Sequence, residues 1–176
     1  MNSILPTFFL SFFLAANSSL TGRDPNVILI LADDMGPGEP SHMGGLVPTP
    51  ALDRMAKEGM RFTDAHTTSS VCTPTRYGIL TGRYNWRSRL KRGVLVKASS
   101  QALMDPNRVN LPNFLQQNGY HTGIVGKWHL GADWELLENP PAGPDRKDDS
   151  WRVDYSKPFR NGPVDVGFDE AFFILS

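Results

Sequence analysis

Short apolar runs alternate with amphipathic stretches along most of the chain. The first run, residues 26–32 (NVILILA), is continuous and stops at a pair of aspartates. Unbroken runs of this length are typical of a strand buried on both faces, as in a parallel sheet covered by helices. Residues 60–66 alternate like a second strand, and further apolar runs predict strands over 120–125 and 167–175. Between the last two strands, residues 132–167 are rich in Pro, Gly and charge and predict a long loop.

The segments between the predicted strands carry helix signals. Thr49 and Pro50 predict an N-cap followed by proline at the first helical position, and Gly59 ends this helix. Residues 74–80 read as the first turns of a second helix, and a short third helix is predicted over 111–118. Strands that alternate with helices predict an α/β fold in which a sheet is sandwiched between helices.

The N-terminus carries an apolar run that we exclude from the fold. This run, residues 4–16, is short for a membrane span but has the length of a signal-peptide core, and small residues suited to cleavage follow it. The alternative is a buried N-terminal helix, which Pro6 and the clustered phenylalanines suit poorly. We therefore expect a signal peptide over 1–22, a folded part over 23–176, export, and no stable membrane span.

Charge and cysteine content narrow the function classes. Eighteen basic and eighteen acidic side chains cancel, which gives no support for nucleic-acid binding. Five basic side chains gather in residues 83–92, where they can select an anionic partner or form a solvated surface, the simpler interpretation. An exported chain with one cysteine has no internal disulfide, so Cys72 stands out as a possible reactive thiol.

Two aspartates, Asp33 and Asp34, follow the first predicted strand directly. Ligands of open α/β sheets bind outside the carboxyl ends of the strands. Adjacent carboxylates repel each other unless a cation lies between them, and hard oxygen ligands of this type suit Ca²⁺ or Mg²⁺. The alternative is a solvated turn in which one aspartate caps a helix.

A second pair of candidates, Lys127 and His129, follows the strand predicted over 120–125. One residue apart on extended backbone, the two side chains are expected to share a face, so that a cation and an imidazole point at one place. This arrangement suits an anionic group, or a nucleophile that exchanges a proton. The alternative is a solvated loop without a role in catalysis.

The lone Cys72 is predicted to lie just before a helix N-terminus. Backbone N–H groups and the helix dipole at that position stabilise a thiolate or a bound anion. Arg76 follows one turn later, so its guanidinium can fold back to an anion beside Cys72. The pattern indicates a nucleophile with an anion site, and its alternative is a buried structural cysteine.

These residues together resemble the type I sulfatases. The stretch Cys72-Thr-Pro-Thr-Arg76, continued by Leu80-Thr-Gly-Arg83, resembles the family signature Cys-x-Pro-x-Arg with a following Thr-Gly. It is preceded by the Asp33-Asp34 pair and by residues 48–62, which also look like the family, and it is followed by GKWHLG at 126–131. The resemblance extends from residue 26 to the C-terminus.

The resemblance implies a sulfatase/alkaline-phosphatase-like fold and a role for each candidate residue. Cys72 would be converted to Cα-formylglycine during export by the formylglycine-generating enzyme, and Arg76 would hold its hydrate. Asp33, Asp34 and the modified Cys72 would ligate Ca²⁺, with Mg²⁺ as the second choice. Lys127 and His129 would contact the hydrate and the sulfate. One hydroxyl of the hydrate would attack sulfur and release the alcohol, and the other would then expel sulfate as the aldehyde re-forms.

The resemblance also implies what to expect of these 176 residues alone. The family supplies further metal ligands, a second sulfate-binding lysine and a leaving-group acid from later in the chain, and no such set follows His129 here. We therefore expect the N-terminal part of a sulfatase catalytic domain, incomplete at the C-terminus, with weak metal binding and negligible turnover. The expected whole is an aryl or carbohydrate sulfate ester hydrolase, periplasmic or secreted, or lysosomal in an animal.

Two alternatives remain open. One is a phosphonate or phosphodiester hydrolase, because the same site architecture can act on phosphoryl esters. The other is a catalytically inactive N-terminal fragment, or a binding protein that retains an inactive site.

Overall fold

The computed structural model describes residues 24–143 and 149–175 of the chain. The predicted signal peptide over 1–22 lies outside the described residues. Contacts divide the chain into two compact units, Met1–Met35 and Gly36–Ser176, and each is described by itself. Among the residues described, no helix has both the length and the apolar character that crossing a membrane requires.

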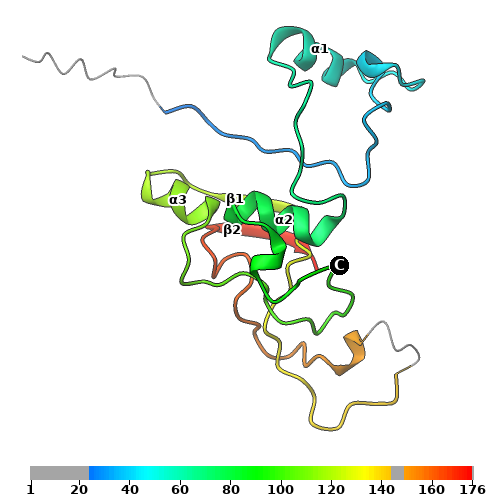
Figure 1. Cartoon of the computed structure of the whole chain (residues 1–176). Helices are drawn as coiled ribbons and strands as arrows, with labels where there is room; N and C mark the ends of the chain where they lie inside the picture. The colour runs from blue at the N-terminus through cyan, green and yellow to red at the C-terminus, as the bar shows by residue number, and fades with distance from the viewer. Residues whose placement is uncertain (1–23, 144–148, 176) are drawn as a thin grey trace, which may run out of the picture. The chain divides into compact units, whose positions relative to one another are not determined.

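A two-stranded parallel sheet lies at the centre of the second unit. Strand β1 (Gly123–Lys127) pairs with β2 (Glu170–Ile174), with Gly123 opposite Glu170 and Lys127 opposite Ile174 (Figure 1). The sequence predicted both strands, but β1 begins three residues later than expected, after the left-handed turn at Gly119. The parallel pairing confirms the α/β prediction.

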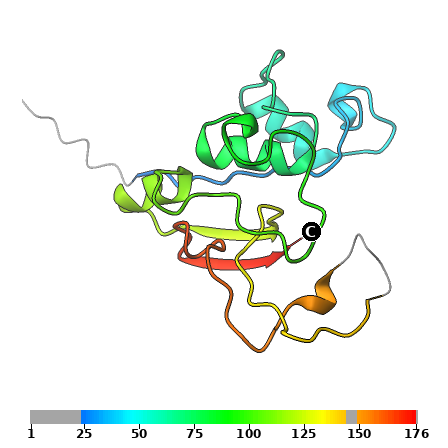
Figure 2. The ribbon, with the colours of Figure 1, turned by 60° about the horizontal axis from the view of Figure 1, so that its bottom comes forward.

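Three α-helices occur in the described part of this unit. They are α1 (Pro50–Glu58), α2 (Cys72–Thr81) and α3 (Leu111–Gln117). Short 3₁₀ helices occur at Ser41–Met43, Asn85–Arg87 and Ser150–Arg152. Both ribbon views place α2 and α3 on the same side of the β1–β2 pair (Figures 1 and 2).

The ends of the helices follow their local sequence with two differences. Helix α3 starts with a capping box, in which the Asn110 and Asn113 side chains each accept the other's backbone N–H. Thr49 is the N-cap of α1, but its hydroxyl donates to the Asp53 carboxylate (3.1 Å) instead of capping the backbone. Helix α2 begins at Cys72, two residues earlier than the prediction.

The Asp53 carboxylate holds the loop before α1. It accepts hydrogen bonds from the Ser41 hydroxyl (2.7 Å), the Thr49 hydroxyl and the His42 backbone N–H (3.0 Å). These donors, the Ser41 hydroxyl first, lower the pKa of Asp53 below its ordinary value. A Gly- and Pro-rich loop thus gains a fixed shape from one carboxylate.

Two predicted strands do not form. Residues 26–32 and 60–66 are irregular, and their apolar side chains are exposed, with Ile28 at 83% and Phe62 at 74%. A strand is stable only when a neighbour takes its backbone hydrogen bonds. Within 24–143 and 149–175, neither segment has such a partner, and the apolar pattern alone does not supply one.

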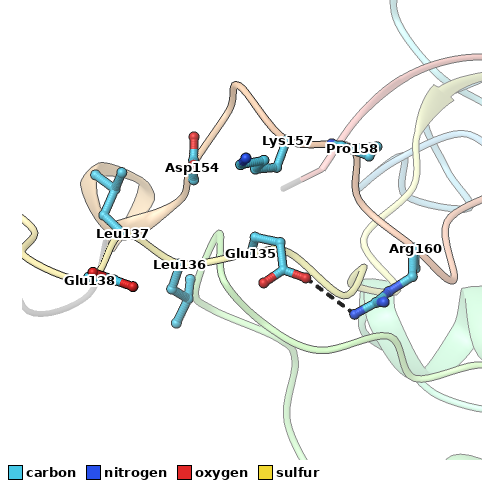
Figure 3. Close-up of a pocket in the computed structure, with 8 residues that line it drawn as sticks. All are labelled: Glu135, Leu136, Leu137, Glu138, Asp154, Lys157, Pro158 and Arg160. Atoms are coloured by element: carbon cyan, nitrogen blue, oxygen red, sulfur yellow. Dashed lines mark hydrogen bonds and ion pairs between the residues drawn. The ribbon is translucent and has the colours of Figure 1, made fainter.

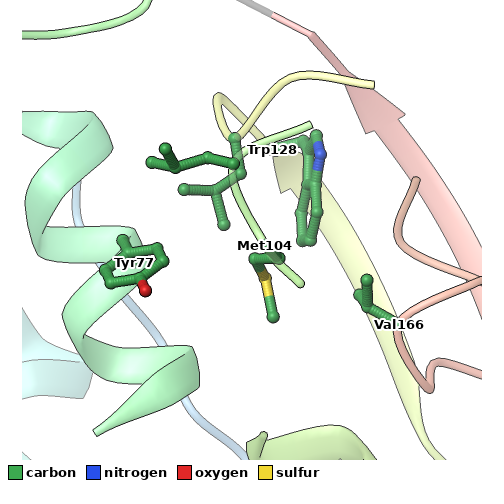
Figure 4. Close-up of a cluster of buried hydrophobic side chains, with 6 residues drawn as sticks. Tyr77, Met104, Trp128 and Val166 are labelled. Atoms are coloured by element: carbon green, nitrogen blue, oxygen red, sulfur yellow. The ribbon is translucent and has the colours of Figure 1, made fainter. Parts of the chain in front are cut away.

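The core of the second unit forms where α2, the end of β1 and two loops meet. Tyr77 of α2 and Trp128 point into one cluster with Met104 and Val166 (Figure 4). Trp128 is 1% exposed, and its indole N–H donates to the Gly131 carbonyl (2.8 Å), so its one polar atom is satisfied. The full cluster consists of Tyr77, Leu103, Met104, Trp128, Leu130 and Val166.

The two faces of the sheet differ. Ile124 and Phe173 pack against the core cluster, whereas the paired residues Val125 and Phe172 are each 82% exposed on the other face. The described residues of the predicted loop over 132–167 are mostly irregular, with isolated bridges at Asp133–Arg160 and Leu136–Val153.

Candidate functional site

Cys72 is the first residue of helix α2. The structure places it inside the helix, where the prediction placed it just before, and Val71 is the N-cap. Its side chain is half-buried, so it is not the fully buried structural cysteine of the alternative interpretation. Pro74 fits the first turn because the N–H that it lacks has no intrahelical acceptor there.

The segment before Cys72 is held against α2 by its own hydroxyl groups. The Thr75 hydroxyl donates to the Ser69 carbonyl (2.7 Å), and the Thr68 hydroxyl donates to the Pro74 carbonyl (3.2 Å). A Cβ at Gly78 would lie 2.1 Å from the Thr68 Oγ1, so this close approach requires glycine. The backbone that leads into Cys72 therefore has a fixed course.

Arg76 joins α2 to the end of β1. Its Nη1 donates to the backbone carbonyl of Lys127 at 2.6 Å. This bond brings the helix that begins at Cys72 together with the segment that carries Lys127 and His129. The sequence predicted these residues as one site without predicting this bond, because a backbone acceptor leaves no mark in the residue pattern. A bond from Arg76 to an anion beside Cys72 stays a prediction.

The chain turns sharply after β1. Trp128 and His129 continue the ladder through N–H bonds to Ile174 O (2.9 Å) and Leu175 O (3.0 Å), but His129 has a left-handed backbone, with φ 53°. The extended backbone therefore ends before His129, and the expectation that Lys127 and His129 point at one place stays a prediction.

The His129 side chain is 8% exposed and firmly anchored. Its Nε2 lies 2.6 Å from the carbonyl oxygen of Leu95. The Leu95 N–H in turn donates to the Thr73 hydroxyl (3.3 Å), and Thr73 is fully buried. Sequence reasoning missed both partners, and since Leu95 acts through its backbone, only the position of Thr73 next to Cys72 offered a signal.

Asp33 and Asp34 lie in the first unit, at a bend. Both are exposed, and Asp34 has a left-handed backbone (φ 60°), which aspartate tolerates better than most residues. Two adjacent carboxylates are hard oxygen donors of the kind that Ca²⁺ takes, so the donor set fits this ion. No group of three or more His, Cys, Asp and Glu gathers at a metal-binding distance in the part of the chain that the structure describes.

A hollow of about 660 Å³ opens in the 132–167 loop (Figure 3). An ion pair between Arg160 and Glu135 (3.3 Å) closes one side of it. None of the predicted site residues lines this hollow. Its lining is Glu135, Leu136, Leu137, Glu138, Asp154, Lys157, Pro158 and Arg160.

The basic run at 83–92 is partly committed to local structure. Arg89 donates to the carbonyls of Gln101 and Ala102, and Lys91 donates to the carbonyl of Trp86. These bonds support the interpretation of the run as a solvated surface.

Comparison with known proteins points to one family. The Sulfatase family model matches residues 25–161. An N-acetylgalactosamine-6-O-sulfatase of Bacteroides thetaiotaomicron is 37% identical over 153 residues, which are 86% of this chain and 27% of that protein. Human arylsulfatase G is 46% identical over 111 residues, 62% of this chain and 21% of its own length. The chain thus spans about a quarter of the length of these relatives.

Solved structures agree in fold. A Bacteroides thetaiotaomicron structure from work on the metabolism of multiple glycosaminoglycans aligns with a TM-score of 0.71 at 36% identity, over 87% of this chain and 28% of that one. Ps i-CgsB in complex with k-i-k-neocarrahexaose aligns with a TM-score of 0.63 at 26% identity, over 88% of this chain and 29% of that one. These alignments confirm the predicted fold class.

Proposed function

Because this chain belongs to the sulfatase family, we propose that residues 23–176 form the N-terminal part of a catalytic domain that hydrolyses sulfate esters. The bond from Arg76 to the Lys127 carbonyl carries this proposal, since it joins the Cys-Thr-Pro-Thr-Arg helix to the Lys-Trp-His segment. The proposed substrates are aryl or carbohydrate sulfates, in keeping with the names of the relatives.

Cys72 is the proposed nucleophile in its oxidised form. Conversion to formylglycine by the formylglycine-generating enzyme during export gives a hydrated aldehyde, whose oxygen attacks the sulfur of the ester. The first helical turn places residue 72 beside backbone N–H groups, which favour negative charge there. Export to the periplasm or the medium, or to the lysosome in an animal cell, is part of the same proposal.

Arg76, Lys127 and His129 are the proposed binding and proton-transfer residues. A guanidinium has five donors in a rigid fork, and the bond to Lys127 O fixes the fork one helical turn after Cys72. Lys127 supplies a positive charge for the sulfate. His129 supplies an imidazole nitrogen that can hold or release a proton.

Asp33 and Asp34 are the proposed protein ligands of a divalent cation, Ca²⁺ before Mg²⁺. The ion, when bound, would neutralise charge on the sulfate oxygens and the attacking oxygen. Ca²⁺ takes about 6–8 oxygen ligands, so two carboxylates and residue 72 hold only part of its coordination shell. We therefore expect negligible turnover from these 176 residues alone.

The test that reports most directly is the mass of the tryptic peptide 62–76, taken from protein secreted by a host with the modifying enzyme. Loss of sulfur in favour of one oxygen at Cys72 is the expected result. A reaction with an aldehyde-specific hydrazide would confirm the product. An intact thiol at full occupancy would refute the proposal.

Two variants control this experiment. Arg76→Lys keeps the charge but loses the fork, and we expect it to lower conversion, because the motif serves as the address for the modifying enzyme. Arg92→Lys makes the same change at an exposed position outside the signature and should be converted like the wild type.

Turnover separates sulfate from phosphate chemistry. This chain can replace the matching part of the Bacteroides relative, to which it is 37% identical over 153 residues. The hybrid should hydrolyse an aryl sulfate faster than the matched aryl phosphate, and Cys72→Ala should abolish both activities without lowering expression. A preference for the phosphate would favour the phosphodiester or phosphonate hydrolase instead.

A further inference from the structure

Three segments that are far apart in the sequence meet at the peptide groups of Leu95. Its N–H donates to the Thr73 hydroxyl (3.3 Å), and its carbonyl lies 2.6 Å from the His129 Nε2. Thr73 is fully buried, His129 is 8% exposed, and the Leu95 side chain packs against the core cluster. One residue thus connects the position after Cys72 with His129.

The partner of the ring determines where its proton lies. A carbonyl oxygen only accepts hydrogen bonds, so the Nε2 of His129 must carry the proton that it shares with Leu95. In the neutral imidazole, the lone pair in the plane of the ring is then on Nδ1. The bond from the His129 N–H to Leu175 O fixes the backbone from which the ring projects.

Thr73 helps to position the Leu95 carbonyl that accepts the bond from His129. The N–H and the carbonyl of Leu95 belong to two successive peptide groups joined at its Cα, so the bond from the N–H to the Thr73 hydroxyl holds in place the backbone from which the carbonyl projects toward the ring. Thr73 is itself held by its place in the first turn of α2, directly after Cys72. The anchor of His129 therefore begins at the neighbour of the proposed nucleophile.

We propose that Thr73 and Leu95 are positioning residues that hold neutral His129 in its Nε2–H form, so that Nδ1 is the nitrogen that serves the reaction. This inference rests on the proposed function for the role of His129, but the arrangement of the proton does not depend on the modification of Cys72. The residue after Cys72 is thereby assigned a task beyond recognition by the modifying enzyme.

The test is nuclear magnetic resonance of the secreted chain with ¹⁵N-labelled histidine. Long-range proton–nitrogen correlations distinguish the two neutral forms of each ring. Wild-type His129 should be almost entirely in the Nε2–H form. Thr73→Val removes the acceptor at nearly constant volume, and the ratio of Nε2–H to Nδ1–H should fall about 2- to 10-fold, the worth of one neutral hydrogen bond.

Two further variants keep the test decisive. Thr73→Ser retains the hydroxyl and should restore the wild-type ratio, including in the event that Thr73→Val fails to fold. Thr81→Val makes the same chemical change at the other end of α2, where the hydroxyl donates to the Tyr77 carbonyl (2.6 Å), and should leave His129 unchanged. A wild-type ring in the Nδ1–H form, or equal ratios in Thr73→Ser and a folded Thr73→Val, would overturn the inference.

The outcome also stays separate from that of the proposed function. An unmodified Cys72 together with a dominant Nε2–H signal from His129 would count against the proposed function, but it would support the positioning role of Thr73 and Leu95. A formylglycine at position 72 together with an Nδ1–H signal from His129 would overturn the positioning role of Thr73 and Leu95, but it would support the proposed function.

Discussion

Two stretches of this chain have the same design and different outcomes. Residues 26–34 and residues 123–129 each consist of small and apolar residues followed by polar candidates for chemistry. The second forms β1, pairs with β2 and leads into the buried Trp128. The first is irregular and exposed, with Ile28 at 83% and Ile30 at 78%.

The two stretches differ in whether a neighbouring strand and a packing surface are present. β1 has the backbone of β2 as its partner, and its inner face meets the core cluster. Residues 27–31 have no backbone hydrogen bond to another residue within the described ranges. An apolar pattern therefore indicates that a segment is suited to a buried environment. A strand forms only where a second strand supplies partners for its backbone hydrogen bonds.

Amide exchange should separate the two stretches most strongly. The N–H groups of 27–31 should exchange at nearly the rate of an unfolded peptide, because no carbonyl holds them. Those of Trp128 and His129, bonded to Ile174 O and Leu175 O, should exchange at least about a hundredfold more slowly. Hydrogen–deuterium exchange read by mass spectrometry measures both, and equal protection would contradict the contrast.

Truncating one large side chain in each stretch should give the next largest effect. Trp128→Ala removes a side chain that is 1% exposed, and it should lower the free energy of unfolding by about 3–5 kcal/mol. Ile28→Ala should change it by less than about 0.5 kcal/mol, because that side chain is already in water. Urea titrations give both values. A large cost at Ile28 would mean that this stretch is packed in solution.

Acid should weaken the junction of β1 and β2. The Asp169 carboxylate accepts the Thr122 backbone N–H (2.7 Å) and the Thr122 hydroxyl (3.0 Å), and these bonds, the backbone one first, lower its pKa. A lowered folded-state pKa gives stability that is present above the unfolded value of about 3.9 and is lost as the pH falls through the folded value.

Asp169→Asn removes this pH-dependent contribution. We expect a lower urea midpoint at pH 7 and a flatter decline of the midpoint between neutral and strongly acidic pH. Asp24→Asn, just before the irregular stretch, should leave the midpoint and its pH dependence as they are. A variant at Asp169 with the wild-type acid profile would show that the carboxylate does not support the junction.

Calcium binding should give the smallest effect. With two adjacent carboxylates and no larger cluster in the described part of the chain, isothermal titration should give a dissociation constant of about 1 mM or weaker. Asp33→Asn and Asp34→Asn should each weaken it further, and Asp24→Asn should not. Micromolar binding by the wild type would mean that more ligands converge on these aspartates than their own stretch provides.

Features that a residue determines through its own conformational preference could be predicted from the sequence. Pro50 and Gly59 delimit α1 as their backbone preferences dictate, and the short α3 ends near Gly119. The long connection predicted between the last two strands is compatible with the parallel pairing of β1 and β2, because parallel strands need a crossover of about a dozen residues or more. The residue types of the family motif also named the candidates of the site.

The contacts that hold the site together could not be predicted in this way. Arg76 bonds to the backbone of Lys127, and His129 bonds to the backbone of Leu95. Every residue carries a carbonyl, so no pattern of side chains distinguishes these two. The left-handed turn at His129 could not be predicted either, because a histidine does not by itself require a positive φ.

The ladder to Leu175 has a consequence for the order of folding. His129 takes its backbone position from a carbonyl far later in the chain, whereas the first turn of α2, which presents Cys72, is closed by residues close to it. Contacts of long sequence separation carry the larger loop-closure entropy and form more slowly. On a chain that emerges from its N-terminus, the helix that begins at Cys72 can take shape early, whereas His129 must wait for the segment of β2 to dock.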